Sequence, residues 1–264
     1  MIRMIEKEEF TIVSLLKACA KNRDLIMGAQ LHALLMKRGG GLLSHSHYLS
    51  SALINMYAKC GALSKARQVL EEIPRRHITA WNALISGYAK LGHGHEALRL
   101  HKCMLQDGVE PNNYTYVALF KACGSMEDVR EGMRFHMEAS KKGYTSDVYV
   151  GSSLVSMYGK CEATMEAENV FENIQNPNVV SWNAMLCIYV EHGHVENALL
   201  LYRQMKESSY VNEDQHTLMF VIHACTALME REKTLADEHG YRVKVISELG
   251  HALHADARKK TFLL

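Results

Sequence analysis

The 264-residue sequence repeats itself at a spacing of about one hundred residues, and this repetition constrains the fold more than any other feature. The pair Trp81-Asn82, for example, returns 101 residues later as Trp182-Asn183. A chain built from repeated segments folds as a row of similar units rather than around one central core. Three kinds of segment recur: 49–73 with 150–174, 80–104 with 181–205, and 10–19 with 114–123 and 216–225.

Each unit has the pattern of two short helices. In 78–112, the apolar residues of 81–88 follow the i, i+3, i+4, i+7 spacing of one helix face, and 97–104 carry a second helix. Gly92 and Gly94 are predicted to interrupt the pair, and Gly108 to end it. A lone hairpin cannot bury its apolar face, whereas stacked copies can. The sequence therefore predicts an all-α fold, an α-α superhelix (solenoid) of stacked helical hairpins.

Composition limits the partners of such an array. Hydrophobic residues make up 48% and charged residues 22% of the chain, which is typical of a folded domain. The formal net charge is only +1, so nucleic-acid binding would have to depend on local basic residues and on base contacts. No apolar run approaches the length of a membrane span, and no membrane partner is expected. No pair of the seven cysteines is spaced C-x-x-C, which favours buried thiols in a reducing compartment.

The alternating segments resemble the pentatricopeptide repeat family, and in particular its plant PLS-type arrays of long, short and standard repeats. The motifs NMYAKCG at 55–61, TAWNALISGYAK at 79–90 and LKAC at 16–19 carry the resemblance. It covers residues 9–225. The units that it implies are 9–46, 47–77, 78–112, 113–147, 148–178 and 179–214, with a partial unit from 215.

The resemblance implies that the array binds single-stranded RNA, one base per repeat. The fifth and last residues of each unit would contact the base edge, and we call these two residues the recognition pair. The second residue would pack on the base. The implied recognition pairs are Ser51 and His77, Asn82 and Asn112, Val117 and Asp147, Ser152 and Asn178, and Asn183 and Asp214. The implied packing residues are Tyr48, Thr79, Tyr114, Tyr149 and Val180.

The family's pairing rules then imply base preferences. Asn82 with Asn112 corresponds to a pyrimidine, Ser152 with Asn178 to adenine, and Asn183 with Asp214 to uracil. Val117 cannot hydrogen-bond a base, so its unit is expected to accept any nucleotide, and no base is assigned to Ser51 with His77. A helical Asn can also simply lie in a solvated groove. Trp81 and Trp182 are expected in the core.

Two further patterns suggest metal chemistry and are set aside. His-Gly-His occurs at 93–95 and at 192–194, but neither copy has a Cys or carboxylate at ligand spacing. His136 and Glu138 match half of a zinc deaminase signature whose C-x-x-C is missing from the chain. No metal, cofactor, catalytic residue or small-molecule substrate is therefore expected, and the chain is not expected to be an enzyme.

The resemblance implies a non-catalytic specificity factor for organellar RNA editing, modification or processing, acting with other editing or processing factors. It implies a mitochondrial or chloroplast location, although the opening MIRMIEKEEF has charges of both signs, unlike a targeting peptide. Two alternatives stay open. A protein-binding scaffold of the tetratricopeptide type is favoured by the near-neutral charge, but its units are about 34 residues throughout. The other alternative is a truncated product without function.

Residues 226–264 leave the repeat pattern. Gly240-Tyr241, Ser247-Glu248 and the final KKTFLL loosely resemble the segment that leads into the DYW-type cytidine deaminase domain of plant editing factors. We expect a degenerate C-terminal tail, as a remnant of that segment in a C-terminally truncated array. A frayed terminus explains the same residues equally well.

Overall fold

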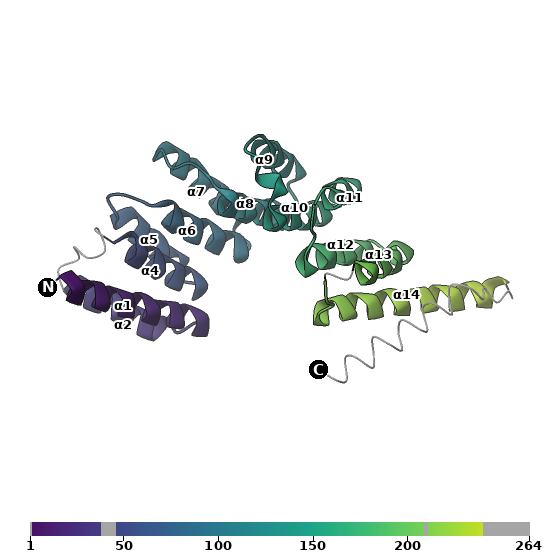
Figure 1. Cartoon of the computed structure of the whole chain (residues 1–264), viewed down its shortest axis with the longest axis horizontal. Helices are drawn as coiled ribbons and strands as arrows, with labels where there is room; N and C mark the ends of the chain where they lie inside the picture. The colour runs from purple at the N-terminus through teal and green to yellow at the C-terminus, as the bar shows by residue number, and fades with distance from the viewer. Residues whose placement is uncertain (1, 38–45, 209–210, 240–264) are drawn as a thin grey trace. The chain divides into compact units, whose positions relative to one another are not determined.

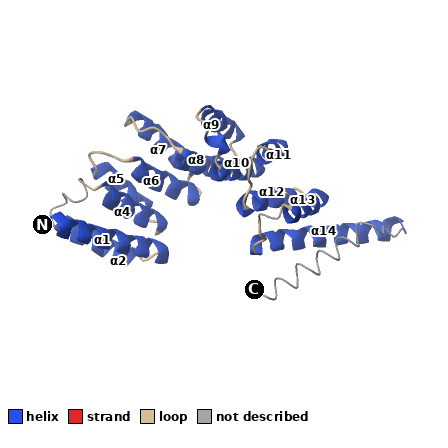
Figure 2. Ribbon diagram, viewed as in Figure 1, coloured by secondary structure: helices blue, strands red, loops and turns tan. Residues whose placement is uncertain are grey.

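The computed structural model describes residues 2–37, 46–208 and 211–239, and this part of the chain contains helices and no strand (Figures 1 and 2). None of its helices is both long enough and apolar enough to cross a membrane. The elements are α1 (Ile2–Asn22), α2 (Leu25–Lys37), α4 (His47–Lys59), α5 (Leu63–Glu72), α6 (Ile78–Lys90), α7 (Gly94–Gln106), α8 (Asn113–Met126), α9 (Val129–Lys141), the 3-10 turn η1 (Tyr144–Ser146), α10 (Val148–Lys160), α11 (Thr164–Glu172), α12 (Val179–Glu191), α13 (Val195–Glu207) and α14 (Gln215–His239).

The chain divides into two compact parts, 1–141 and 142–264. In the first part the first helices of successive hairpins contact each other in the order α1, α4, α6 and α8, and α2, α5, α7 and α9 each pack on their own hairpin partner. In the second part α10 contacts α12, and α12 contacts α14, with α11 and α13 packed beside them. The predicted all-α solenoid of stacked helical hairpins is confirmed.

The core repeats with the sequence. Trp81 and Trp182 are buried, as predicted, with 3% and 7% of their surface exposed. Met56 and Met157, which occupy equivalent places, are also buried. The apolar residues that repeat along the chain are thus the ones that bury one face of each successive helix.

The turns differ in one detail from the sequence prediction. Gly92 has a φ of +80° and follows α6, whereas Gly94 is the first residue of α7. Gly94 does not interrupt a helix but lies at a close approach, because an added Cβ would lie 2.9 Å from the carbonyl oxygen of Ala122. At the other end of the array, α14 continues to His239 and includes the first part of the predicted tail. Residues 240–264 of that tail lie outside the described residues.

Glycines also set how closely successive first helices approach each other. A Cβ on Gly87 of α6 would lie 2.8 Å from the Cβ of Ala58 on α4. On α10, a Cβ on Gly159 would lie 2.2 Å from Ile188 of α12. Both distances are shorter than two non-bonded carbon atoms can approach. The helices therefore stack this closely because these two residues are glycines, which have no Cβ.

Replacing Gly87 with Ala tests this packing. In an open helix the change would stabilise by about 1 kcal/mol, but overpacking costs about 1–3 kcal/mol. We expect a net loss of about 1 kcal/mol in the free energy of unfolding, measured by urea denaturation followed by circular dichroism. Ser86→Ala, one residue away on the same helix, adds no atoms and serves as control. A Gly87→Ala protein as stable as the control would contradict the packing argument.

Candidate nucleic-acid interface

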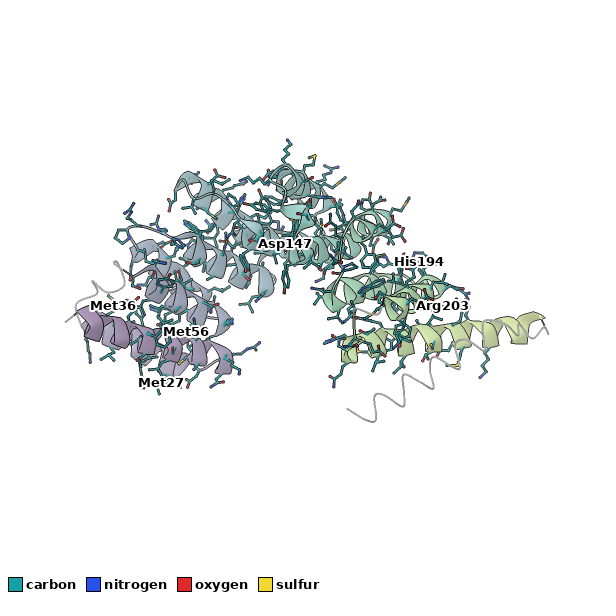
Figure 3. All side chains as sticks on the ribbon, viewed as in Figure 1. Met27, Met36, Met56, Asp147, His194 and Arg203 are labelled. Carbon is teal, nitrogen blue, oxygen red and sulfur yellow. The ribbon has the colours of Figure 1, made fainter. Side chains whose placement is uncertain are left out.

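The last residue of each predicted unit from 78 onward caps the helix that follows it. Asn112 is the N-cap of α8, and its Oδ1 accepts a hydrogen bond of 3.1 Å from the backbone N–H of Thr115. Asp147, labelled in Figure 3, caps α10, and Asn178 caps α12 in the same way. Asp214 accepts from the backbone N–H of Thr217 in the first turn of α14. A short polar side chain is required at such positions because the first N–H groups of a helix have no partner within it.

The structure brings together Asn82 and Asn112, although 29 residues separate them in sequence. Asn82 of α6 donates from Nδ2 to Oδ1 of Asn112 over 3.0 Å. Thr115 completes a triad, because its hydroxyl lies 2.7 Å from Oδ1 of Asn82 and accepts from the backbone N–H of Asn112. Thr115 is fully buried, and both Asn side chains are half-buried.

The same triad recurs in the second compact part. Asn183 of α12 donates from Nδ2 to Oδ1 of Asp214 over 2.9 Å. The buried Thr217 donates its hydroxyl hydrogen to Oδ1 of Asn183 over 2.7 Å and accepts from the backbone N–H of Asp214. Burial acts to raise the pKa of Asp214, but the hydrogen bonds from Thr217 and Asn183 outweigh it and lower that pKa below its usual value. Asp214 is therefore a carboxylate at neutral pH.

Sequence reasoning missed Thr115 and Thr217. Each is the third residue of its unit, and each lies three residues after the polar cap that it bonds. A Thr three residues after an Asn or Asp at a helix start is a capping-box pattern, and that signal was present in the sequence.

Ser152 and Asn178 are linked indirectly. Ser152 is buried, and its hydroxyl donates to the carbonyl oxygen of Val148 over 2.6 Å. Its Oγ accepts from the hydroxyl of Ser181 over 2.7 Å, and Oγ of Ser181 lies 3.2 Å from Oδ1 of Asn178. Ser181 thus takes the place that Thr115 and Thr217 have in the two triads.

The remaining recognition pairs differ from these. Thr79, predicted as a packing residue, is hydrogen-bonded to both Ser51 and His77. Val117 lies on α8, and Asp147 is the N-cap of α10 in the other compact part.

Large side chains at the predicted packing positions are exposed at the starts of first helices. The exposed fractions are 71% for Tyr114, 66% for Tyr149 and 55% for Val180, and 67% for Tyr48. An exposed aromatic ring or branched side chain at a repeated place has no role in the core and offers an apolar face to a ligand.

Lysines end three of the same helices. Lys59, Lys90 and Lys160 each follow a packing residue by 11 residues, and all three are exposed. Eleven residues complete three turns of an α-helix to within about 20°, so the lysine and the packing residue lie on one helix face. These lysines add positive charge at the C-terminal ends of the first helices despite the near-neutral total. On α12 the equivalent residue is Glu191.

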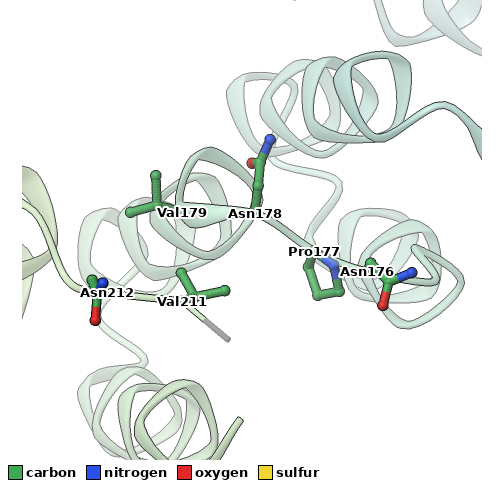
Figure 4. Close-up of a pocket in the computed structure, with 6 residues that line it drawn as sticks. All are labelled: Asn176, Pro177, Asn178, Val179, Val211 and Asn212. Atoms are coloured by element: carbon green, nitrogen blue, oxygen red, sulfur yellow. The ribbon is translucent and has the colours of Figure 1, made fainter. Parts of the chain in front are cut away.

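A surface cavity of about 370 Å³ lies beside Asn178 (Figure 4). Its lining is Asn176, Pro177, Asn178, Val179, Val211 and Asn212. None of these side chains is charged. Among the residues that the structure describes, no cluster of His, Cys, Asp and Glu could hold a metal ion. His192 instead lies 2.8 Å from the hydroxyl of Thr164.

Comparisons with known proteins agree with the repeat. A family model described as PPR repeat family matches residues 76–125 and 177–226, and a PPR repeat model matches 49–78. A chloroplastic pentatricopeptide repeat-containing protein of Arabidopsis thaliana is 38% identical over 224 residues, which are 84% of this chain and 36% of that protein. A mitochondrial one from the same plant is 34% identical over 218 residues, 83% of this chain and 21% of that protein. The chain spans about a third or less of the length of these relatives.

One solved structure shows the same fold. The crystal structure of PPR10 in complex with an 18-nt psaJ RNA element matches with a TM-score of 0.62 and 20% identity. The match covers 94% of this chain and 38% of PPR10.

Replacing Thr217 with Val tests the triad. The change keeps the shape of the side chain but removes the hydroxyl that bonds Asn183 and the backbone of Asp214, and it leaves buried polar groups unpaired. We expect the free energy of unfolding to fall by about 1–2 kcal/mol in urea denaturation. Thr226→Val, on the same helix, is the control, because the Thr226 hydroxyl bonds only the Ile222 carbonyl one turn earlier. Equal stability of the two variants would count against the triad.

Proposed function

The chain belongs to the pentatricopeptide repeat family, and we propose that it binds single-stranded RNA with base selectivity. In this proposal it acts as a non-catalytic specificity factor in organellar RNA editing or processing, together with other editing or processing factors. The relatives named chloroplastic and mitochondrial support a location in one of these organelles. The RNA element bound to PPR10 supports RNA as the ligand.

The observation that carries the proposal is the recurrence of the Asn-based triad at the same place in two units. In the second copy, Oδ1 of Asp214 accepts from Nδ2 of Asn183 and from the backbone N–H of Thr217. Helix capping therefore occupies one carboxylate oxygen. The other, Oδ2, takes no part in this network and has His216 at 3.7 Å. It is left as an acceptor at a half-exposed site.

These atoms are complementary to uracil. The uracil ring has an N–H donor between two carbonyl acceptors, so the N–H matches Oδ2 of Asp214. The second Nδ2 hydrogen of Asn183 matches a neighbouring carbonyl. A cytosine would instead present a ring-nitrogen acceptor to an oxygen that can only accept.

Asn112 offers the opposite chemistry. Its Oδ1 accepts from Nδ2 of Asn82 and from the backbone N–H of Thr115, so its Nδ2 donor is the atom left for a ligand. A donor matches the ring nitrogen of cytosine better than the N–H of uracil. Among the pyrimidines, the unit 78–112 is proposed to favour cytosine.

Stacking and charge would supply the rest of the affinity. The exposed Tyr114, Tyr149 and Val180 can pack on base faces, and each stacked base contributes about 1–3 kcal/mol. Lys59, Lys90 and Lys160 would pair with phosphates.

We also propose the division into repeat units that the sequence predicts. The unit boundaries are supported by the helices, because α4, α6, α8, α10, α12 and α14 begin at residues 47, 78, 113, 148, 179 and 215. We keep the array at 9–225, its PLS-type alternation and the degenerate tail at 226–264 as proposals.

Competition binding tests the function. A labelled unpaired RNA with the order pyrimidine, any base, adenine, uracil should bind, because its base edges are accessible to the recognition pairs. The same sequence closed in a hairpin stem should compete poorly, since its base edges are already paired. Equal competition by stem and unpaired strand would refute base-edge recognition.

Asp214→Asn tests the residue-level assignment. The amide keeps an oxygen for the cap and replaces the free acceptor with a donor, so the preference for uracil at that position should shift toward cytosine. The shift should correspond to about 1–3 kcal/mol of discrimination, measured with four RNAs that differ at that base. Asp147→Asn, which changes a cap in the unit that is expected to accept any base, is the control and should leave every preference unchanged. A flat profile for both wild type and Asp214→Asn would show that the assignment is wrong.

A further inference from the structure

The third residue of each unit from residue 47 onward is buried, with at most 1% of its surface exposed. These residues are Leu49, Ala80, Thr115, Val150, Ser181 and Thr217. Three of them carry a hydroxyl group, although an apolar side chain would suit such a place better. A buried hydroxyl costs free energy unless it is hydrogen-bonded, so its presence calls for a reason other than packing.

The third residue of a unit matches the fifth residue of the unit before it. A polar fifth residue is followed by a hydroxyl in three pairs: Asn82 with Thr115, Ser152 with Ser181, and Asn183 with Thr217. An apolar fifth residue is followed by an apolar third residue in two pairs: Val13 with Leu49, and Val117 with Val150. Unit 47–77 differs, because Ser51 is followed by Ala80, and the hydroxyl beside Ser51 belongs to the exposed Thr79.

The hydroxyl of Thr115 has a defined direction. Its oxygen accepts from the backbone N–H of Asn112 over 3.1 Å, and a backbone N–H can only donate. Its single hydrogen then goes to Oδ1 of Asn82 at 2.7 Å, which is nearer than Oδ1 of Asn112 at 3.1 Å. Because Nδ2 of Asn82 donates to Oδ1 of Asn112, both ends of the Asn82 amide are held.

Holding both ends of the amide selects one of its two orientations. An asparagine amide keeps nearly the same shape after a half-turn, but the half-turn exchanges its donor and its acceptor. In a half-turned Asn82, an N–H would face the hydroxyl hydrogen of Thr115, and two oxygens would face each other at Asn112. The hydroxyl of Thr115 therefore fixes which polar atoms of Asn82 remain for a ligand.

Ser181 has the same relation to Ser152. The Ser152 hydroxyl donates to the carbonyl oxygen of Val148, so its oxygen accepts from Ser181 over 2.7 Å. Ser181 thus occupies one lone pair of Ser152 and leaves the remaining acceptor in a fixed direction.

We propose that the hydroxyl at the third place of a unit is a positioning group for the unit before it, and that base selectivity depends on it although it does not contact the base. The inference rests on the proposed binding of single-stranded RNA. Thr115, Ser181 and Thr217 are the positioning residues. Each belongs to the hairpin that follows the one whose fifth residue it orients, so the selectivity of a unit depends on its C-terminal neighbour as well as on its own residues.

Binding to four unpaired RNAs that differ only at the nucleotide assigned to unit 78–112 tests the role of Thr115. The wild type should bind the best of the four about tenfold more tightly than the worst. Thr115→Val and Thr115→Ala remove the hydroxyl and keep the backbone N–H that Asn112 caps, and both should reduce this ratio to about one. Thr115→Ser keeps the hydroxyl and should keep the ratio.

The three variants separate positioning from packing. Val keeps the shape of Thr, whereas Ser and Ala both lose the methyl group, so a packing role predicts that Val keeps the ratio and that Ser loses it. Valine, alanine and serine occupy the same buried place in other units, as Val150, Ala80 and Ser181, so the variants are expected to fold, which thermal unfolding checks. The nucleotide assigned to unit 179–214 is the control, because Thr217 is unchanged and discrimination there should stay as in the wild type.

The outcomes separate this inference from the proposed function. Absence of binding of the wild type to any unpaired RNA would overturn both. Discrimination by the wild type that survives in Thr115→Val, or that is lost in Thr115→Ser, would overturn the inference alone. So would a loss of discrimination at both nucleotides in the Thr115 variants, since the change would then disturb the array as a whole.

Discussion

Helix capping is the interaction on which the candidate interface depends. Every first helix in the array begins with N–H groups that have no partner in the helix, and a polar side chain just before the helix can satisfy them. The chain meets this requirement with the last residue of the preceding unit, as Asn112 and Asn178 show. The cap therefore ties each hairpin to the next, and it also holds one atom of that side chain in a fixed direction.

When capping fixes one polar atom of a side chain, the position of the second polar atom of the same side chain is fixed as well. Asn, Asp and His can all accept a capping hydrogen bond with one side-chain atom. The second polar atom is an N–H donor in Asn, an acceptor oxygen in Asp and a ring N–H donor in His. The substitutions between them change the ligand-facing chemistry and leave the fold almost untouched. This separation between a structural atom and a ligand-facing atom in one side chain suits a protein whose units must share a fold and differ in specificity.

The sequence allowed the hairpins, the core and the starts of the helices from residue 47 to be predicted, because apolar periodicity reports burial directly. Trp81 and Trp182 are buried as expected, and both members of two recognition pairs lie within hydrogen-bonding distance. The capping pattern of Thr115 and Thr217 is visible in the sequence, but their hydrogen bonds to Asn82 and Asn183 on the preceding first helix are not. Thr115 and Thr217 act through contacts between helices, and Thr79 takes a polar role at a place predicted for packing. Such choices depend on geometry between units, which residue spacing alone does not encode.

The close approach at Gly87 has a consequence beyond packing. Adjacent helices usually lie about 8–10 Å apart, and the side chains at their contact set the value within that range. Gly87 lets α6 approach Ala58 of α4 more closely than a side chain at that position would allow, and this contact sets the spacing of the two helices. If the recognition pairs bind RNA as proposed, this spacing would also set the distance between successive nucleotides. A bulkier residue there would lengthen one interval, and every unit beyond it would meet the strand slightly out of phase.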